Sequence, residues 1–166
     1  MKRVLVTGAT GFIGYEVAHQ LCEKGLRPKL MVRRPTRGAL FARLPVDLVQ
    51  GDLTRPATLA RAVEGVDTII HLGARATFES YERLRETNVE GTEHLMEAAI
   101  GAGVERFIFA SSMFVYGSVN SPITSETTPV PELGYGRAKL EAETRLRTMA
   151  DQVGMPLASI RLPHVY

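Results

Sequence analysis

Tyr135 and Lys139 are four positions apart in a stretch with helical periodicity, so both side chains should lie on one helix face. A nearby ammonium stabilises a phenolate and should lower the pKa of the tyrosine from its usual value of about 10, making it usable as an acid or base. Lys139 is the only lysine after Lys29 in a chain whose cations are mostly arginine. The alternative is an ordinary surface pair. Ser112, expected where a buried strand ends, favours acid–base chemistry over that alternative.

A second motif lies near the start of the chain, where an apolar strand over residues 3–7 runs into three spaced glycines and then an amphipathic helix. Glycine permits positive φ and close backbone approach, which suits a tight turn, contact with a pyrophosphate and close helix–strand packing. The helix offers free N–H groups and a positive dipole end to phosphate. A tight turn without a ligand is the alternative. The residues expected to contact a dinucleotide here are Gly8, Thr10, Gly11, Phe12, Ile13 and Gly14.

Arg33 and Arg34 follow the second expected strand. In a nucleotide-binding βαβ unit an acidic residue at this place binds the ribose 2′-hydroxyl of NAD, whereas arginine suits the 2′-phosphate of NADP. The stretch contains no carboxylate, and guanidinium groups pair with phosphate bidentately. The sequence therefore favours NADP over NAD as cofactor, with a solvated basic loop as the alternative.

Two further strand ends carry candidate cofactor contacts. After the third strand come Asp52 and Leu53, and Asp52 either accepts a hydrogen bond from an adenine amino group or caps the next helix. Small residues after the fourth strand would let a cofactor lie against backbone, and the candidates there are Leu72, Gly73 and Ala74. His71 has no metal-ligating neighbours at suitable spacing, so we interpret it as a packed histidine and expect no metal site.

Asn88 is expected on the buried face of a long helix, because Leu84, Asn88, Gly91, Leu95 and Ala98 recur at steps of three and four residues. A buried amide needs hydrogen-bond partners. Asn88 should therefore bind the backbone of a neighbouring strand or hold a water near the site.

These residues require a scaffold in which strands and helices alternate. Apolar runs predict about six strands, near residues 3–7, 28–33, 46–50, 67–72, 104–110 and 156–162. Helical patterns fill the gaps near residues 12–24, 38–44, 56–64, 80–102 and 135–152. The alternation predicts an α/β fold with a doubly wound parallel sheet. The one long irregular stretch, residues 111–134, is expected to be functional.

Composition sets the broad class. The chain has 166 residues, 45% hydrophobic and 23% charged, with a net charge of +2, which is typical of one globular domain and does not indicate a nucleic-acid surface. No apolar run is long enough for a signal peptide or a membrane span. The single cysteine, Cys22, cannot form an internal disulfide and fits a reducing compartment, so we expect a cytoplasmic protein.

Taken together, the motifs resemble the extended short-chain dehydrogenase/reductase family of NAD(P)-dependent epimerases and dehydratases. The motifs that carry the resemblance are Thr7-Gly8-x-x-Gly11-x-x-Gly14, Gly51-Asp52, His71-Leu72-Gly73-Ala74, Asn88-Val89-Glu90-Gly91-Thr92, Ser111-Ser112 with Val115-Tyr116-Gly117, and Tyr135-x-x-x-Lys139. The resemblance implies a Rossmann fold, a small-molecule substrate and hydride transfer between nicotinamide and a carbinol or carbonyl carbon. It makes Tyr135 the acid/base and Lys139 the residue that lowers its pKa and holds the nicotinamide ribose. Ser112 would bind the reacting oxygen, and Asn88 would support the nicotinamide end.

The family pattern also implies what surrounds this chain. Its members are considerably longer, so we expect residues 1–166 to be a dinucleotide-binding domain, with the substrate-binding domain that follows in relatives missing. His164 stands where nucleotide-sugar members tend to carry asparagine, and Arg33 with Arg34 is more similar to the NADP-using ketone reductases. A homodimer through helices 80–102 and 135–152 is implied by the resemblance alone. Two alternatives remain: a non-catalytic NADP-binding or redox-sensing module, and a cofactor-binding fragment that is inactive without its substrate domain.

Overall fold

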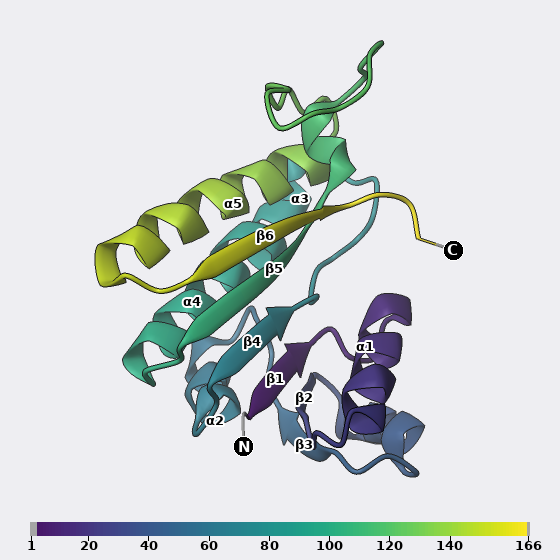
Figure 1. Ribbon diagram of the computed structural model, residues 1–166, viewed down its shortest axis with the longest axis vertical. Coiled ribbons are helices and arrows are strands. Elements are labelled where there is room, and N and C mark those ends of the chain that lie inside the picture. The colour runs from purple at the N-terminus through teal and green to yellow at the C-terminus, as the bar shows by residue number, and fades with distance from the viewer. Residues whose placement is uncertain (1–2, 166) are drawn as a thin grey trace.

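The computed structural model describes residues 3–165 and contains one six-stranded sheet in which every strand pair is parallel (Figure 1). The strands are β1 (Val4–Thr7), β2 (Lys29–Val32), β3 (Asp47–Gln50), β4 (Thr68–His71), β5 (Arg106–Ser112) and β6 (Leu157–Leu162). Each lies within two residues of a predicted strand. The predicted α/β fold with a doubly wound parallel sheet is confirmed.

The strand order is β3-β2-β1-β4-β5-β6, so the direction of winding reverses next to β1. β1 pairs with β4 in a register that places Thr7 opposite His71. In open parallel sheets, ligands bind at the carboxyl ends of the strands on either side of such a reversal. The loops that follow Thr7 and His71 are therefore the parts of the fold placed to form a binding site.

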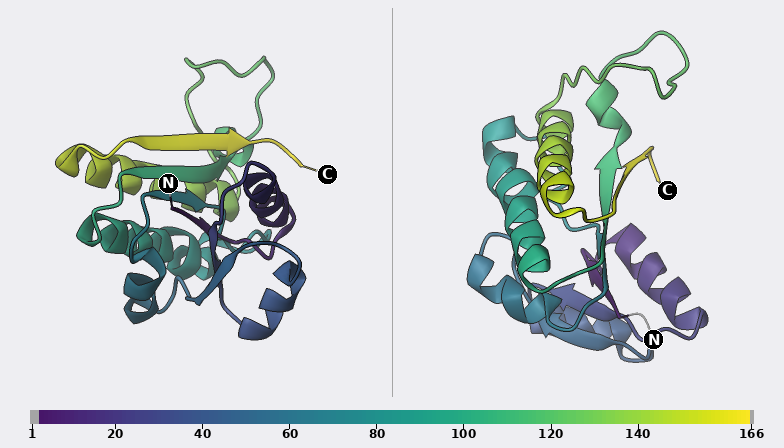
Figure 2. Two further views of the ribbon diagram at one scale, coloured as in Figure 1. Left: turned by 60° about the horizontal axis from the view of Figure 1, so that its bottom comes forward. Right: turned by 60° about the vertical axis from the view of Figure 1, so that its left-hand side comes forward.

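Helices cover the two faces of the sheet unequally (Figure 2). On one face α1 (Phe12–Glu23) packs through Ala18 on Val6 and Leu30. The other face is covered by α2 (Leu59–Val63), α4 (Gly91–Gly101) and α5 (Gly134–Val153). Their apolar residues bury a larger core, whose fully buried side chains include Leu5, Leu59, Ile69, Leu95, Met96, Phe107, Phe109 and Leu146.

The single helix predicted over residues 80–102 is a helical stretch in three parts. A π turn, η3 (Glu86–Glu90), separates α3 (Tyr81–Arg85) from α4. The turn contains Asn88, whose amide is held by the backbone of Arg75. Directly after it, Gly91 lies against Leu53, where an added Cβ would be 2.7 Å from the Leu53 Cβ. These tertiary contacts fix the wide turn, a feature common near functional sites. Ala98, expected on the buried face, is half-buried, and Ala99 is fully buried instead.

Three other boundaries differ from the prediction. The helix expected over residues 38–44 is a 3-10 helix at η1 (Pro35–Phe41), because Pro35 starts it early and Gly38 lies against Leu48. The helix expected over 56–64 begins with a 3-10 turn, η2 (Pro56–Thr58), before α2. The predicted loop 111–134 starts too early, because β5 pairs with β6 as far as Ser112 and continues into η4 (Met113–Tyr116). Residues 117–133 form the irregular segment.

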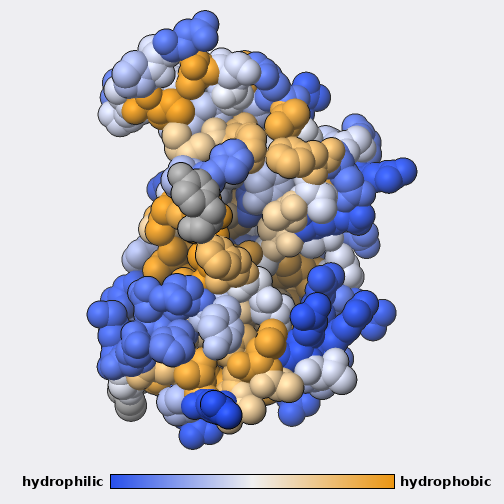
Figure 3. Space-filling model, turned by 90° about the vertical axis from the view of Figure 1, so that its right-hand side faces the viewer, coloured by the Kyte–Doolittle hydropathy of each residue, from blue (hydrophilic) through white to orange (hydrophobic). Residues whose placement is uncertain are grey.

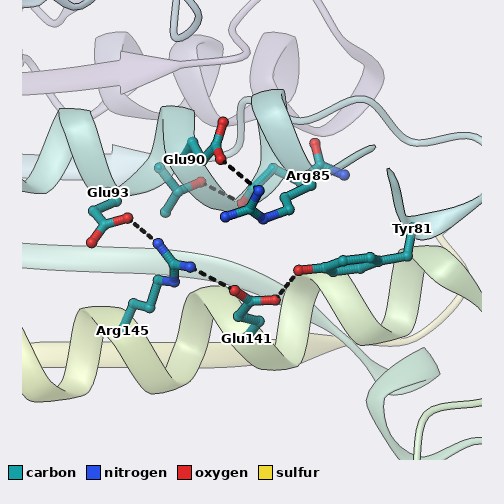
Figure 4. Close-up of polar contacts among 8 residues, drawn as sticks. Tyr81, Arg85, Glu90, Glu93, Glu141 and Arg145 are labelled. Atoms are coloured by element: carbon teal, nitrogen blue, oxygen red, sulfur yellow. Dashed lines mark hydrogen bonds and ion pairs between the residues drawn. The ribbon is translucent and has the colours of Figure 1, made fainter. Parts of the chain in front are cut away.

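A polar network joins the outer layer of helices α3, α4 and α5 (Figure 4). Arg145 on α5 pairs with Glu93 on α4 and, at 2.8 Å, with Glu141 one turn away. The hydroxyl of Tyr81 donates to the same Glu141. The outer surface of this helix layer is consequently charged. No helix among residues 3–165 combines the length and the apolar character needed to cross a membrane.

Candidate active site

The glycine turn after β1 has the geometry its spacing predicts. Gly8 has φ +69°, and an added Cβ there would lie 2.6 Å from the Gly73 nitrogen. The Gly11 N–H donates to the Gly8 carbonyl at 3.0 Å, and a Cβ on Gly14 would overlap that carbonyl. Glycines at 8 and 14 therefore allow α1 and the loop after β4 to approach the end of β1 closely.

The first turn of α1 is open to an anion. Gly11, the N-cap residue, supplies no side-chain cap, and the first turn contains no acidic residue. Thr10, Gly11 and Phe12 are exposed, and Ile13 is half-buried. Because N–H groups at a helix start lack partners within the helix, this turn presents donors and a positive dipole end beside the strand reversal.

A hydrogen-bonded chain of buried side chains joins the ends of β1 and β4. The Thr7 hydroxyl accepts from the Gly73 N–H at 3.1 Å and lies 2.6 Å from Nδ1 of His71. Nε2 of His71 lies 3.0 Å from the Thr92 hydroxyl, which donates to the Asn88 carbonyl. Burial, assisted by the charge of Lys139, lowers the pKa of His71 to about 3, so the ring is neutral. A neutral ring protonated on Nε2 satisfies every partner in this chain.

His71 is thus a packed histidine, as predicted. Its ring is 1% exposed and stacks on Phe109. Among residues 3–165 no group of three or more His, Cys, Asp or Glu side chains is arranged to hold a metal ion.

Asn88 holds the segment that follows β4. Its side-chain oxygen accepts from the Arg75 N–H at 2.7 Å, and its amide donates to the Arg75 carbonyl at 3.0 Å. The residue is 1% exposed. The predicted burial and backbone contact are confirmed, although the backbone belongs to the loop after β4. Asn88 thereby fixes the course of Leu72, Gly73 and Ala74 past the end of the sheet.

Arg33 and Arg34 are exposed beyond the end of β2. Within residues 3–165 neither guanidinium forms an ion pair or a hydrogen bond. Asp52 Oδ1 accepts from the N–H and the hydroxyl of Thr54, both at 3.0 Å, in a local turn. Asp52 does not cap the helical turn that follows, whose N-cap residue is Arg55 and has no side-chain cap. Leu53 is 6% exposed and lies beside Gly73. Leu53 therefore lies at the strand reversal. Arg33 and Arg34 lie beyond the end of β2 and are exposed to solvent.

Ser112, Tyr135 and Lys139 converge at the carboxyl end of β5. The Lys139 ammonium donates to the Ala110 carbonyl at 2.7 Å and lies 5.8 Å from the centre of the Tyr135 ring. Ser112 is 7% exposed, and its hydroxyl oxygen accepts from the Phe114 N–H at 3.2 Å. The Phe114 ring in turn packs edge-to-face on Tyr135. Strand β5, its 3-10 turn and α5 therefore place the three predicted residues in one neighbourhood.

The prediction that Lys139 lowers the pKa of Tyr135 is wrong for this structure. Burial raises the pKa of Tyr135 above its usual value. Burial also lowers the pKa of Lys139 to about 7, with Glu143 opposing the change, so the lysine is only partly charged at neutral pH. Its ammonium points to the Ala110 carbonyl and lies 4.5 Å from the Phe109 ring. Desolvation therefore outweighs attraction by the ammonium at the phenol.

Some residues of this neighbourhood were not predicted as site residues. Phe114 touches Ser112 and Tyr135, and Thr7 touches both His71 and Gly73. Arg161 joins Glu143 to Tyr116. For Thr7 the signal was its place directly before Gly8 at a strand end. For Phe114 and Arg161 no local spacing identifies the partners, because the contacts are made by residues distant in sequence.

Figure 3 looks onto the carboxyl ends of the strands. Apolar side chains gather there across a hollowed middle, below the lobe formed by residues 117–133, and hydrophilic side chains lie toward the margins. The face that carries the candidate residues is thus concave and largely apolar at its centre.

Comparisons with known proteins agree with this geometry. The chain is 35% identical to a 3 beta-hydroxysteroid dehydrogenase/Delta 5-->4-isomerase of Mycobacterium tuberculosis, over 97% of this chain and 46% of the relative. It is 32% identical to the UDP-glucose 4-epimerase of Vibrio cholerae, over 99% of this chain and 52% of that protein. The crystal structure of the dTDP-glucose 4,6-dehydratase DesIV of Streptomyces venezuelae, which has NAD bound, superposes with a TM-score of 0.87 at 28% identity, covering 96% of this chain and 55% of that one.

The chain thus spans about half the length of the curated relatives it matches. The model of the NAD dependent epimerase/dehydratase family matches residues 4–166. The predicted resemblance is confirmed, and the chain belongs to the NAD-dependent epimerase/dehydratase family.

Proposed function

We propose that this chain is the cofactor-binding part of an NADP-dependent oxidoreductase that transfers hydride between nicotinamide and a carbinol or carbonyl carbon. The observation that carries the proposal is the convergence of Ser112, Tyr135 and Lys139 at the end of β5, next to the strand reversal. The relatives are named for a steroid and for nucleotide sugars, so the family supports an oxidoreductase without selecting the substrate.

The residues present fit a dinucleotide. The glycine turn after β1 and the uncapped first turn of α1 offer N–H donors for a pyrophosphate. Together they comprise Gly8, Thr10, Gly11, Phe12, Ile13 and Gly14. The guanidinium groups of Arg33 and Arg34, which have no partner within residues 3–165, would bind a 2′-phosphate, which supports NADP over the NAD found in DesIV. Because Thr54 engages Oδ1 of Asp52, an adenine contact of Asp52 would use its other carboxylate oxygen. Leu53, Leu72, Gly73 and Ala74 would line the path between adenine and nicotinamide.

The nicotinamide supplies or accepts the hydride when it is bound. Side chains of this chain would orient the substrate and transfer the proton. Ser112 Oγ already accepts a hydrogen bond from Phe114, so its own proton is free to be donated to a substrate oxygen. Because burial raises the pKa of Tyr135, the phenol is neutral at pH 7 and suited to protonating a carbonyl oxygen during reduction. Lys139 would hold the nicotinamide ribose, and Asn88 would keep the Ala74–Arg75 segment in place.

We further propose that residues 1–166 form the dinucleotide-binding domain and that a separate segment completes the substrate site. The half-length match to the relatives supports this division. So does the face of β6 away from α5, where Ile160 is 50% exposed. A cofactor-binding piece that turns nothing over by itself is accordingly the second candidate. Homodimerisation through helices 80–102 and 135–152 stays a prediction, on a surface that carries ion pairs.

The test is a fluorescence titration of the complete gene product with NADPH and with NADH. We expect saturable binding of both reduced dinucleotides, tighter for NADPH, and oxidation of the bound NADPH when a ketone is added. A protein that binds neither dinucleotide contradicts the proposal, and tighter binding of NADH contradicts its NADP specificity.

A further inference from the structure

A small cavity lies beside the Ser112 hydroxyl, at the carboxyl ends of β5 and β6. Its volume is about 200 Å³, and its wall includes Ser112, Phe114, Ile123, Leu162, Pro163 and His164. Among residues 3–165, its lining contains no arginine, lysine, aspartate or glutamate, and His164 is the one titratable residue in it. Apart from the serine hydroxyl and the imidazole, the side chains offer only apolar contact.

Phe114 and His164 line this cavity, and Phe78 packs on Phe114, so that the three rings form one continuous wall. The Phe114 ring packs edge-to-face on Phe78, with ring centres 5.9 Å apart, and on His164 at 5.3 Å. It also meets the Tyr135 ring at 6.2 Å. Phe78 is 77% exposed. The wall therefore extends from the proposed acid/base outward to solvent.

The two arginines that lie three positions before His164 and Phe78, Arg161 and Arg75, are both paired. Arg161 precedes Leu162 of the cavity wall, but successive side chains of a strand point to opposite faces. Its guanidinium is engaged by Glu143 and by the Tyr116 hydroxyl. Arg75, near the start of the segment that carries Phe78, pairs with Glu79 at 2.6 Å. Among residues 3–165, the lining of this cavity therefore offers a charged substrate group no arginine or lysine partner.

We propose that the substrate is an uncharged ketone or secondary alcohol with an apolar ring body that packs on the wall of Phe78, Phe114 and His164. This proposal rests on the proposed function. The carbonyl carbon gains a hydride from NADPH while its oxygen gains the proton of Tyr135, so the ketone becomes an alcohol and NADPH becomes NADP+. Aromatic faces and edges bind flat apolar bodies, and the one hydroxyl at the inner end, Ser112, orients the polar oxygen.

The experiment compares 2-decalone, an uncharged fused-ring ketone, with UDP-glucose. Dissociation constants are measured by saturation-transfer NMR on the complete gene product saturated with NADP+. We expect 2-decalone to bind more tightly than UDP-glucose. Replacing Phe78 by serine should weaken 2-decalone binding about threefold to tenfold, since an exposed aromatic contact is lost. Because Phe78 is mostly exposed, the Phe78→Ser substitution should leave the fold intact.

The matched control is Leu40→Ser, which removes a 47% exposed apolar side chain from η1, at the β3 side of the sheet. It should leave 2-decalone binding unchanged. Tighter binding of UDP-glucose, or equal effects of the two substitutions, would overturn the proposal. Failure of the proposed function is recognised separately, because it would appear as absent NADPH binding in the same preparation before any ketone is added.

Discussion

The guanidinium of Arg161 joins Glu143 and Tyr116, donating to Glu143 Oε2 at 2.7 Å and to the Tyr116 hydroxyl at 2.6 Å. Glu143 lies one helical turn after Lys139 on α5, and Tyr116 ends the 3-10 turn that follows Ser112. One cation on β6 therefore connects the two segments that carry the candidate catalytic residues. Glu143 is 9% exposed, so this ion pair is largely shielded from water.

Removing the guanidinium should destabilise the fold. Arg161→Met leaves the Glu143 carboxylate buried without its partner, which we expect to lower the free energy of unfolding by about 2–4 kcal/mol in urea denaturation. The control is Arg27→Met, which breaks the exposed pair with Asp47, whose side chains are 64% and 56% exposed. That change should cost much less, because water screens an exposed ion pair. Equal effects of the two substitutions would contradict the structural role of Arg161.

The buried histidine predicts an acid-sensitive fold. Because the pKa of His71 is about 3 in the folded chain and about 6.5 when unfolded, only the unfolded state takes up a proton between these values. The contribution of His71 to the free energy of unfolding should be complete above about pH 6.5 and fall as the pH drops, by at most about 1.4 kcal/mol per pH unit. The free energy of unfolding is measured between pH 5 and about 6.5, above the pH range in which carboxylates titrate. Its slope with pH should be lost in His71→Gln. His19→Gln, at a ring 41% exposed, should keep it.

Close packing at the glycine turn can be tested with two helical glycines. A Cβ on Gly14 would overlap the Gly8 carbonyl, whereas one on Gly101 would meet nothing within 4 Å. We expect Gly14→Ala to lower the free energy of unfolding by about 2–3 kcal/mol, because α1 must move from β1. Gly101→Ala should be neutral or slightly stabilising. Thermal unfolding measures the stability of both variants. An unchanged stability in Gly14→Ala would show that α1 does not pack this closely on the turn after β1.

The proposed preference for NADP depends on Arg33 and Arg34. The double substitution Arg33→Ser/Arg34→Ser should raise the dissociation constant of NADPH about tenfold to a hundredfold, because bidentate contacts to the 2′-phosphate are lost. NADH, which lacks that phosphate, should be affected less than about twofold. Arg37→Ser, on the same exposed segment, serves as the control. A parallel loss of NADH affinity would mean that the arginines do not read the 2′-phosphate.

The sequence was sufficient for the parts of the fold that depend on local pattern. Apolar runs located all six strands, and glycine spacing located the turn after β1. The π turn at Asn88 could not be predicted, because it depends on the Arg75 backbone and on Leu53. The 3-10 form of η1 likewise reflects a contact between Gly38 and Leu48, on different elements.

At the candidate site, the spacing of Tyr135 and Lys139 predicted that they share one helix face. It could not predict how strongly each side chain is desolvated. The ring of Phe109 and the carbonyl of Ala110, both on β5, determine how deeply Lys139 is buried. Burial of Tyr135 itself raises the pKa of its phenol, which is the reverse of the expected direction. Such a reversal requires the packed structure, because desolvation depends on neighbours far along the chain.

The central claim is that Tyr135 moves the proton while nicotinamide moves the hydride. Tyr135→Phe removes only the hydroxyl, and Tyr81→Phe makes the same change at a tyrosine that bonds Glu141 in the outer helix layer. In the complete gene product, we expect Tyr135→Phe to slow ketone-dependent NADPH oxidation by at least about a hundredfold, with the NADPH dissociation constant changed less than twofold. Tyr81→Phe should keep the wild-type rate. An unchanged rate in Tyr135→Phe would contradict the account.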